Sequence, residues 1–148
     1  MDIRTVNIPI KKVRDDAVIP EYKFVCDAGC DLVCCDESVV IPVGKIKVVH
    51  TGIAVKIPWG FEGQIRPRSG MAIKKGISVV NTPGTIDSDY TGEIMVGVIN
   101  LGERLFTIRK GDRFAQLVFS PVYKGVFHPV EDLESTLRGE GGIGHTGV

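Results

Sequence analysis

Two aspartates and a tyrosine stand close together in the segment 84–94, which reads GTIDSDYTGEI. The segment follows the turn signal Asn81-Thr82-Pro83-Gly84 and leads into a strand-like run that begins at Glu93. A carboxylate on a rigid turn can orient and deprotonate a water, and a neighbouring aromatic ring can wall off a flat substrate. Asp and Gly also favour turns for conformational reasons alone. The segment therefore predicts either a hydrolytic site or a simple hairpin.

A second segment whose residue types could bind a ligand is Arg68-Ser69-Gly70. We expect a brief helix to open near Ser69, with this serine as a good N-cap and the residues 71–73 following. A helix N-terminus presents free backbone N–H groups that suit a phosphate, and Arg68 adds a planar donor fork. Gly70 lets the backbone approach a ligand closely. The alternative is an ordinary capped helix beside a surface arginine.

Length and charge exclude several classes of function. The 148 residues are enough for one domain with a real core, and 18 basic residues offset 18 acidic ones. No global field therefore attracts nucleic acid or a membrane surface. No apolar run approaches membrane-spanning length, and the N-terminus lacks the apolar core of a signal peptide. We expect a cytoplasmic protein with reduced thiols.

The four cysteines fall within ten residues, at Cys26, Cys30, Cys34 and Cys35. A metal site is one interpretation, but structural zinc sites favour two separated pairs. Strand-like alternation near Cys30 to Cys34 would also send Cys34 and Cys35 to opposite faces. We therefore expect buried, reduced thiols rather than a metal site.

Short alternating runs with Gly and Pro between them dominate the chain and predict an all-β protein, an antiparallel sandwich or jelly roll. The runs comprise 46–48, 53–57, 94–98, 105–108 and 114–118. A second short turn is expected around 131–133. Half of the residues 138–147 are glycine, so we expect one β domain over 1–137 and a flexible C-terminal arm over 138–148.

Five segments, in this order, resemble the five motifs of the trimeric dUTPases. They are 27–32 (DAGCDL), 67–72 (PRSGMA), 84–94, 111–117 (GDRFAQL) and 138–144 (RGEGGIG). The resemblance runs from about Cys26 to the C-terminus. It implies a jelly-roll-like barrel of the β-clip type and a homotrimer in which three chains contribute to each active site.

The resemblance implies hydrolysis of dUTP to dUMP and pyrophosphate by Mg²⁺-assisted water attack on the α-phosphate. Such an activity limits uracil incorporation into DNA and supplies dUMP for dTMP synthesis. The catalytic carboxylate would be Asp87, although the residues alone do not separate it from Asp89. Tyr90 would lie beneath the sugar and exclude a 2′-hydroxyl, and Asn81 would read the base together with the hairpin backbone up to Met95.

The resemblance also implies a wider set of contacts. Asp31 would contact a hydrated Mg²⁺, which bridges the phosphates. Arg113 is not expected to contact the substrate, and we expect it to be a structural ion-pair partner. The implied substrate-binding residues are Arg68, Ser69, Gly70, Asn81, Thr85, Ile86, Asp87, Tyr90, Met95, Gln116, Arg138, Ile143 and Gly144.

The chain departs from the family pattern at Ile143, where the arm usually carries a phenylalanine that stacks on uracil. Isoleucine can cover the base but cannot stack on it, so we expect weaker lid closure. Two other functions are compatible with the scaffold. One is dCTP deamination, although this chain has Arg68-Ser69-Gly70 where the deaminases continue with another serine and a further arginine. The other is non-catalytic nucleotide binding.

Overall fold

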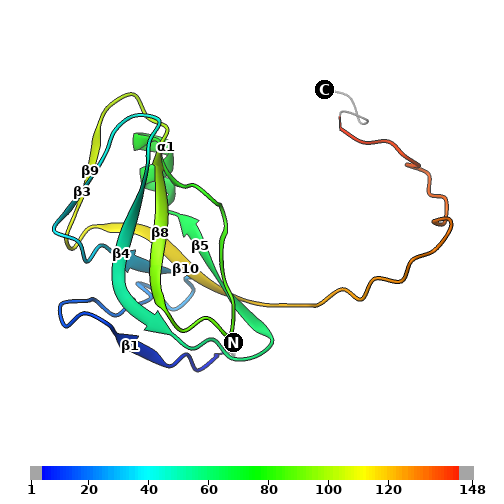
Figure 1. The fold of residues 1–148 in the computed structure, drawn as a ribbon, viewed down its shortest axis with the longest axis horizontal. Coiled ribbons are helices and arrows are strands. Elements are labelled where there is room, and N and C mark those ends of the chain that lie inside the picture. The colour runs from blue at the N-terminus through cyan, green and yellow to red at the C-terminus, as the bar shows by residue number, and fades with distance from the viewer. Residues whose placement is uncertain (1–4, 144–148) are drawn as a thin grey trace.

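The computed structural model describes residues 5–143, and almost all of its regular structure is β-strand (Figure 1). One four-stranded sheet has the order β1-β4-β8-β6, and a second has the order β2-β10-β5-β7. The strands of the first are β1 (Ile10–Lys12), β4 (Ile46–Val55), β8 (Glu93–Asn100) and β6 (Ile77–Val79). Those of the second are β2 (Cys30–Val33), β10 (Arg113–Pro121), β5 (Phe61–Pro67) and β7 (Gly84–Ile86).

A two-stranded sheet of β3 (Ser38–Ile41) and β9 (Phe106–Arg109) completes the β domain. Every pairing is antiparallel. The all-β, jelly-roll-like class predicted from the short alternating runs is confirmed. Three of those runs became β8, β9 and β10, which contribute buried residues to one continuous apolar core. Burial alternates regularly along β8, whereas β10 buries adjacent pairs of residues.

Strand β4 changes its exposure along its length. Ile46 and Val48 are about half exposed in the single chain, whereas every residue from Thr51 to Val55 is buried. The change coincides with an irregular register between His50 and Ala54 and with a positive φ of 69° at Gly52. An extra residue in one strand produces this type of bulge, and glycine accepts the backbone angle without strain.

Strand β5 positions both candidate site segments, 84–94 and 68–70. It pairs with β10 on one side and with β7 on the other. Helix α1 (Ser69–Lys75) follows directly after β5 and ends at Gly76, which takes the left-handed conformation and donates its N–H to Ala72 and Met71 carbonyls. The helix lies beyond the C-terminal end of β5 (Figure 1). Ile86, the last residue of β7, pairs with Gly63 near the other end of β5.

The helix predicted near Ser69 is present, but the predicted cap is wrong. Arg68 is the N-cap, in extended conformation and without a side-chain cap hydrogen bond, and Ser69 is the first helical residue. The helix therefore starts one position earlier than serine capping predicts, and the side chain of its N-cap residue pairs with Asp31 instead of capping the helix.

Three of the cysteines are buried free thiols, as predicted, but Cys26 is exposed. Burial raises the pKa of the Cys30, Cys34 and Cys35 thiols. The Cys34 thiol donates to the Asp36 carbonyl and the Cys35 thiol to an Asp16 carboxylate oxygen, so the two neighbours point to different partners. Cys26 lies in a loop before β2, whereas Cys30 begins β2 and the adjacent buried residues Cys34 and Cys35 directly follow it.

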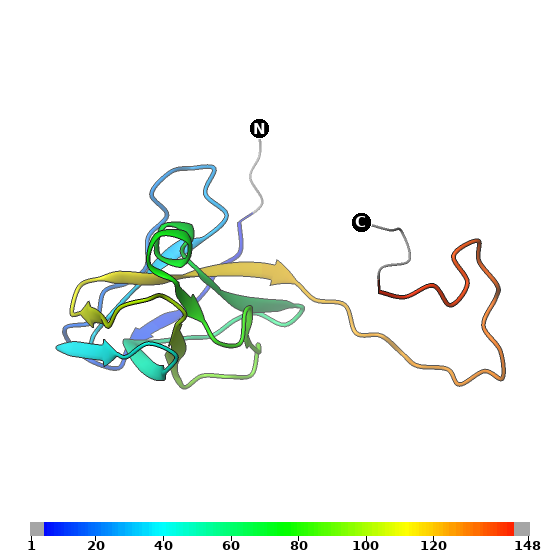
Figure 2. The same cartoon turned by 90° about the horizontal axis from the view of Figure 1, so that it is seen from above.

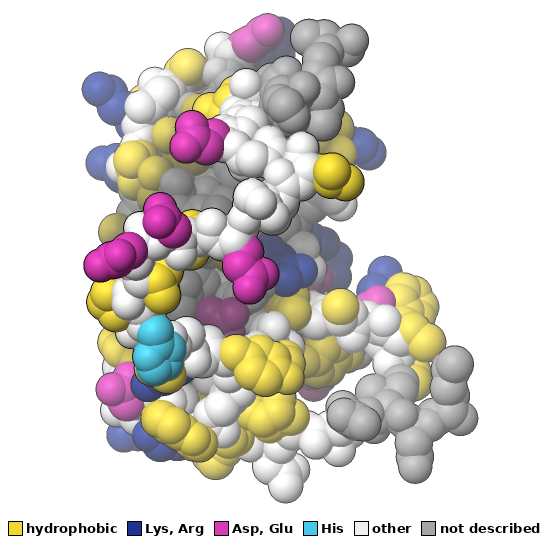
Figure 3. All heavy atoms as spheres, turned by 90° about the vertical axis from the view of Figure 1, so that its right-hand side faces the viewer, with side chains coloured by type: hydrophobic (Ala, Val, Ile, Leu, Met, Phe, Trp, Pro, Cys, Tyr) yellow, Lys and Arg dark blue, Asp and Glu magenta, His cyan; other side chains and the backbone are white. Residues whose placement is uncertain are grey.

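After β10 the chain leaves the β domain, and the residues 122–143 form no strand or helix (Figures 1 and 2). We call these residues the C-terminal segment. The predicted turn around 131–133 is only a bend at Glu131, and a turn lies instead at 137–140. Seen from the side of this segment, several acidic side chains lie across the upper and middle parts of the face, and hydrophobic side chains occur in both halves (Figure 3). Within residues 5–143, no helix is long and apolar enough to cross a membrane.

Candidate functional site

A pocket of about 150 Å³ opens beside the loop that joins β7 to β8. Its lining consists of Thr85, Ile86, Asp87, Tyr90, Glu93 and Met95. Five of these six residues are predicted substrate contacts, and the structure brings them together within one loop and its flanking strands. We call this the hairpin pocket. The sequence patterns did not single out the sixth residue, Glu93, as a site residue.

The Tyr90 ring is held in the wall of the hairpin pocket by two hydrogen bonds. Its hydroxyl donates to the Glu93 carbonyl oxygen at 2.8 Å, and its backbone N–H donates to the Asp87 carbonyl oxygen at 3.1 Å. The second bond closes a turn over residues 87–90. The aromatic ring and the aspartate are therefore parts of one compact turn, and their relative position is set by the backbone.

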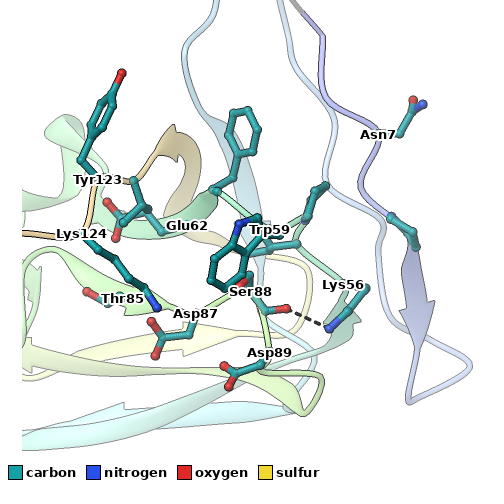
Figure 4. Close-up of a pocket in the computed structure, with 16 residues that line it drawn as sticks. Asn7, Lys56, Trp59, Glu62, Thr85, Asp87, Ser88, Asp89, Tyr123 and Lys124 are labelled. Atoms are coloured by element: carbon teal, nitrogen blue, oxygen red, sulfur yellow. Dashed lines mark hydrogen bonds between the residues drawn. The ribbon is translucent and has the colours of Figure 1, made fainter.

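The Asp87 side chain lies where two cavities meet. It lines the hairpin pocket and also a wide open cavity of about 1030 Å³ that contains Asp89, Trp59 and Lys56 (Figure 4). The Lys56 ammonium donates to the Ser88 carbonyl oxygen at 3.0 Å and so anchors the turn from the end of β4. Asp87 is exposed and open to water, whereas Asp89 lines only the wide cavity.

Asn81 lies on the other side of β7 from Asp87 and is exposed. Its amide group folds over Gly84, where an added Cβ would come within 3.4 Å of Asn81 Nδ2. Asn81 is not part of the lining of the hairpin pocket. Its amide is nevertheless adjacent to the first residue of β7, the strand that carries Thr85 and Ile86.

A second cluster forms around Asp31 in β2. Arg68 Nε lies 2.8 Å from Asp31 Oδ1, and Arg113 Nη1 lies 3.2 Å from Asp31 Oδ2. Arg68 also donates to the Arg113 carbonyl oxygen at 2.8 Å, and Gln116 donates its amide to the Pro67 carbonyl oxygen at 3.0 Å. We call this the arginine cluster. The ion pair predicted for Arg113 is present.

The arginine cluster contains three of the residues that the sequence predicts for phosphate and metal binding, namely Asp31, Arg68 and Gln116. Ser69 and Gly70 follow at the start of α1 and are exposed. An added Cβ at Gly70 would meet nothing within 4 Å. The surface above the cluster is therefore open to a ligand.

The hairpin pocket and the arginine cluster lie at opposite ends of β5. Ile86 pairs with Gly63 and Gly84 pairs with Ile65, so Asp87 continues toward Glu62 while Arg68 lies beyond the other end of the strand. Glu62 and Arg68 are six residues apart along an extended chain, which corresponds to about 20 Å. One chain therefore does not bring Asp87 and Arg68 to the same phosphate group.

The start of the C-terminal segment, 122–124, lines the wide cavity together with Asp87. Arg138 Nε donates to the Gly141 carbonyl oxygen at 2.7 Å, inside the turn at 137–140 and its following residue. Ile143 is fully exposed. Both residues are predicted substrate contacts, and neither lines the hairpin pocket or the wide cavity. Gly144, predicted as a further contact, lies outside the described residues.

The donor atoms of Asp31 fit a hydrated divalent ion better than a dehydrated one. Each carboxylate oxygen already accepts from an arginine, but an ionised carboxylate has about four acceptor sites, so lone pairs remain for metal-bound water. Over the described range 5–143, no group of three or more His, Cys, Asp or Glu side chains could hold a metal ion. Mg²⁺ usually keeps several waters and takes few carboxylates, which agrees with this arrangement.

Comparison with known proteins identifies the fold and its relatives. The family model described as dUTPase matches residues 15–147. A deoxyuridine 5′-triphosphate nucleotidohydrolase from Syntrophotalea carbinolica is 49% identical over 146 residues, which cover 98% of this chain and 99% of that protein. Its counterpart from Crocosphaera subtropica is 50% identical, with 97% and 100% covered.

Solved structures agree with the sequence relatives. The dUTPase of Staphylococcus bacteriophage 80alpha, solved with dUPNHPP, has a TM-score of 0.89 and 28% identity, with 97% of this chain and 100% of that chain covered. A mutant dUTPase from phage phi11 of S. aureus has a TM-score of 0.78 and 25% identity, with 86% and 98% covered. That structure was described for the coordination of a structural Mg(II) ion.

Proposed function

The chain belongs to the dUTPase family, and from that premise we propose that it hydrolyses dUTP to dUMP and pyrophosphate. The observation that carries the proposal is the hairpin pocket, in which a water-accessible carboxylate, an aromatic wall and an open strand edge meet in one loop. The pocket is small, with a volume of about 150 Å³, which suits a single pyrimidine ring. The relatives over nearly the whole chain are nucleotidohydrolases of this substrate.

In the proposed mechanism Asp87 accepts a hydrogen bond from the attacking water and takes its proton as the water adds to the α-phosphate. The open position of Asp87 between two cavities supports this role, because water and the phosphate chain can reach the carboxylate from different sides. The leaving group is pyrophosphate. Asp89 faces only the wide cavity, so we assign it no direct role in the proton transfer.

Substrate selection is assigned to the same loop. Tyr90 would pack against C2′ of the sugar and exclude ribonucleotides by a steric clash. Thr85, Ile86, Met95 and the Asn81 amide would surround uracil. Cytosine carries an amino group where uracil has a carbonyl, so the wrong base would leave buried polar groups without partners.

The arginine cluster is proposed to bind the phosphates. Arg68 can offer its remaining N–H groups, and Ser69, Gly70 and Gln116 add polar contacts beside it. Asp31 would hold a hydrated Mg²⁺ through metal-bound water. When bound, Mg²⁺ would neutralise part of the charge on the phosphate chain.

We propose that the active enzyme is a homotrimer with shared sites. The support is geometric, because the phosphate chain of one nucleotide is shorter than the separation of about 20 Å between Asp87 and Arg68 along β5. Joining the hairpin pocket of one copy to the arginine cluster of another removes the difficulty. The half-exposed apolar residues Ile46 and Val48 are additional surface that a second copy could cover.

The residues 138–148 are proposed to form a lid that closes over a bound nucleotide, with 1–137 as the β domain. Arg138 would contact the phosphates, and Ile143 with Gly144 would cover the base. The hydrogen bonds recorded for residues 138–143 join them to one another and to Thr136, and neither Arg138 nor Ile143 lines the hairpin pocket or the wide cavity, which is compatible with an open lid. Closure would exclude water that does not take part in the reaction.

The proposed activity limits uracil incorporation into DNA and supplies dUMP for dTMP synthesis. We place it in the cytoplasm, because four free cysteines suit a reducing compartment. The balanced charge of 18 basic and 18 acidic residues supports a small-molecule substrate rather than nucleic acid or a membrane surface as the partner.

The activity is tested by incubating the purified protein with Mg²⁺ and, in turn, dUTP, dCTP, dTTP and UTP, and by measuring pyrophosphate, ammonia and orthophosphate. Pyrophosphate from dUTP alone is the expected result. Ammonia from dCTP would indicate a deaminase, and no product from any nucleotide would indicate a binding protein on this scaffold.

The shared site is tested by mixing two impaired variants, Asp87→Asn and Arg68→Ala, after partial unfolding and joint refolding. If sites combine residues from different chains, some sites in the mixed oligomer contain both wild-type residues, and kcat/KM for dUTP rises above the mean of the two variants. A mixture whose kcat/KM stays at that mean would show that each chain builds its own site.

A further inference from the structure

We infer that the Glu93 side chain is a positioning residue for sugar selection, because it fixes the strand end to which Tyr90 is bound. The inference deepens the proposed function and depends on it. Glu93 is the first residue of β8, and its side chain is about one-fifth exposed. Its carboxylate and its backbone carbonyl face in different directions and hold different parts of the site.

The carboxylate binds strand β4. Glu93 Oε1 accepts the Gly52 N–H at 2.8 Å, and Glu93 Oε2 lies 3.1 Å from His50 Nδ1. An ionised carboxylate only accepts hydrogen bonds, so His50 Nδ1 carries the proton in this contact. Both oxygens of one side chain are therefore used to join β8 to β4.

These contacts occur where the regular ladder between the two strands is interrupted. His50 pairs with Met95 and Ala54 pairs with Glu93, and the register shifts between these pairs. The Gly52 N–H, which a regular ladder would pair with a backbone carbonyl, is satisfied by the Glu93 carboxylate instead. The side chain thus substitutes for the missing ladder bond at the start of β8.

The backbone carbonyl of Glu93 binds the tyrosine. It accepts the Tyr90 hydroxyl at 2.8 Å, and this is the bond that fixes the far end of the ring. A ring that is fixed at its hydroxyl end presents a stationary wall to the sugar, and a ring that can swing admits a 2′-hydroxyl. The chain of contacts from Gly52 and His50 through Glu93 to Tyr90 therefore sets how strictly the pocket rejects ribonucleotides.

Glu93 is not the only residue whose side chain joins β4 to β8 here. The Thr51 hydroxyl donates to the Ile94 carbonyl oxygen at 2.6 Å and is buried, so it joins the same two strands one residue further along. We therefore expect Glu93→Ala to fold. The expected change is in the order of the loop 87–93 rather than in the presence of the sheet.

The experiment compares kcat/KM for dUTP with kcat/KM for UTP, by pyrophosphate release, in the full-length wild type and in variants. Glu93→Ala should lower the dUTP-to-UTP selectivity about tenfold, the factor that corresponds to about 1.4 kcal/mol. Glu93→Gln should restore most of the selectivity, because the amide oxygen can still accept the Gly52 N–H. The matched control is Glu37→Ala, since Glu37 is an exposed glutamate that pairs with Lys110.

Selectivity is the informative readout because a loss of folded protein lowers both rates equally and cancels in the ratio. Tyr90→Phe removes the hydroxyl but keeps the ring, and it should lower selectivity to a similar extent. The double variant should then lose little more than either single variant, since both remove the same restraint. If Glu93→Ala yields no folded enzyme, Tyr90→Phe and Glu93→Gln still decide the question.

Wild-type selectivity in Glu93→Ala or in Tyr90→Phe would overturn the inference, and so would strictly additive losses in the double variant. These results differ from a failure of the proposed function, in which the wild type itself would release no pyrophosphate from dUTP. An equal loss of selectivity in Glu37→Ala would also overturn it, because the effect would not be specific to this position.

Discussion

The hairpin pocket and the arginine cluster lie at opposite ends of β5 and differ in how their side chains are held. In the hairpin pocket, hydrogen bonds within one turn fix the backbone, and the carboxylate of Asp87 is left free. In the arginine cluster, Arg68 and Arg113 both pair with Asp31, so the cluster keeps one net positive charge. This difference fits the proposed division of labour, in which Asp87 acts as the base at one end and the cluster binds phosphate at the other.

The largest effect is expected for Asp87→Asn, which tests the proposed base. An amide cannot take a proton from water, so kcat for dUTP should fall about 1000-fold, while dUTP binding changes little. The matched control is Asp89→Asn in the same turn, for which the loss should stay below about tenfold. Pyrophosphate release and calorimetric binding check the two quantities. Comparable losses of kcat in both variants would remove the distinction between the two aspartates.

A smaller effect is expected for Arg68→Ala, which tests the arginine cluster. It removes a charge-assisted phosphate contact and leaves Asp31 with only Arg113, so kcat/KM for dUTP should fall roughly 10- to 100-fold. Arg66→Ala is the control, because Arg66 is exposed and binds Gln64 on its own strand. A loss of the same size in Arg66→Ala would show that positive charge in general, rather than this cluster, binds the phosphates.

A still smaller effect is expected for Ile143→Phe, which tests whether an aromatic ring at this position favours closure of the lid. A ring that stacks on uracil should favour closure by about 1 kcal/mol and raise kcat/KM about fivefold. Leu137→Phe places the same ring at an exposed position before the glycine-rich residues and should have no effect. Unchanged KM and kcat in Ile143→Phe would contradict the idea that the missing ring matters.

The smallest effect on activity is expected for Asp16→Asn, far from both clusters. A hydrogen bond from Lys110, followed by one from Cys35, holds the Asp16 pKa well below its usual range. A carboxyl group whose pKa is lower in the folded state stabilises the fold above its unfolded pKa of about 3.9, and this contribution is lost as the pH falls. The melting temperatures of wild type and Asp16→Asn should therefore differ by a constant amount near pH 7, and the difference should begin to narrow as the pH falls below about 4.

Thermal unfolding from pH 7 to pH 3 checks this prediction, with Asp15→Asn as the adjacent control. Activity at pH 7 should be unchanged in both variants. A difference between wild type and Asp16→Asn that widens as the pH falls would mean that the carboxylate is not stabilised in the folded protein.

Local patterns predicted the β-strands and the first helix well, because alternation and turn residues act over a few positions. They were less successful at element ends and in loops. Serine capping predicts the N-cap at Ser69, but Arg68 is the N-cap and pairs its side chain with Asp31. Likewise Cys26 was grouped with its buried neighbours although its loop leaves the sheet, and Ile46 and Val48 face outward despite their alternation.

The sequence alone determined the family, the all-β class and which residue types gather near Asp87, since these depend on local order along the chain. Only the tertiary structure decided that Asp87 and Arg68 lie about 20 Å apart along β5, because strand register sets that separation. It also decided which group accepts the Gly52 N–H. A bulge between His50 and Ala54 leaves the Gly52 N–H without a ladder partner, and only folding brings the Glu93 carboxylate to it.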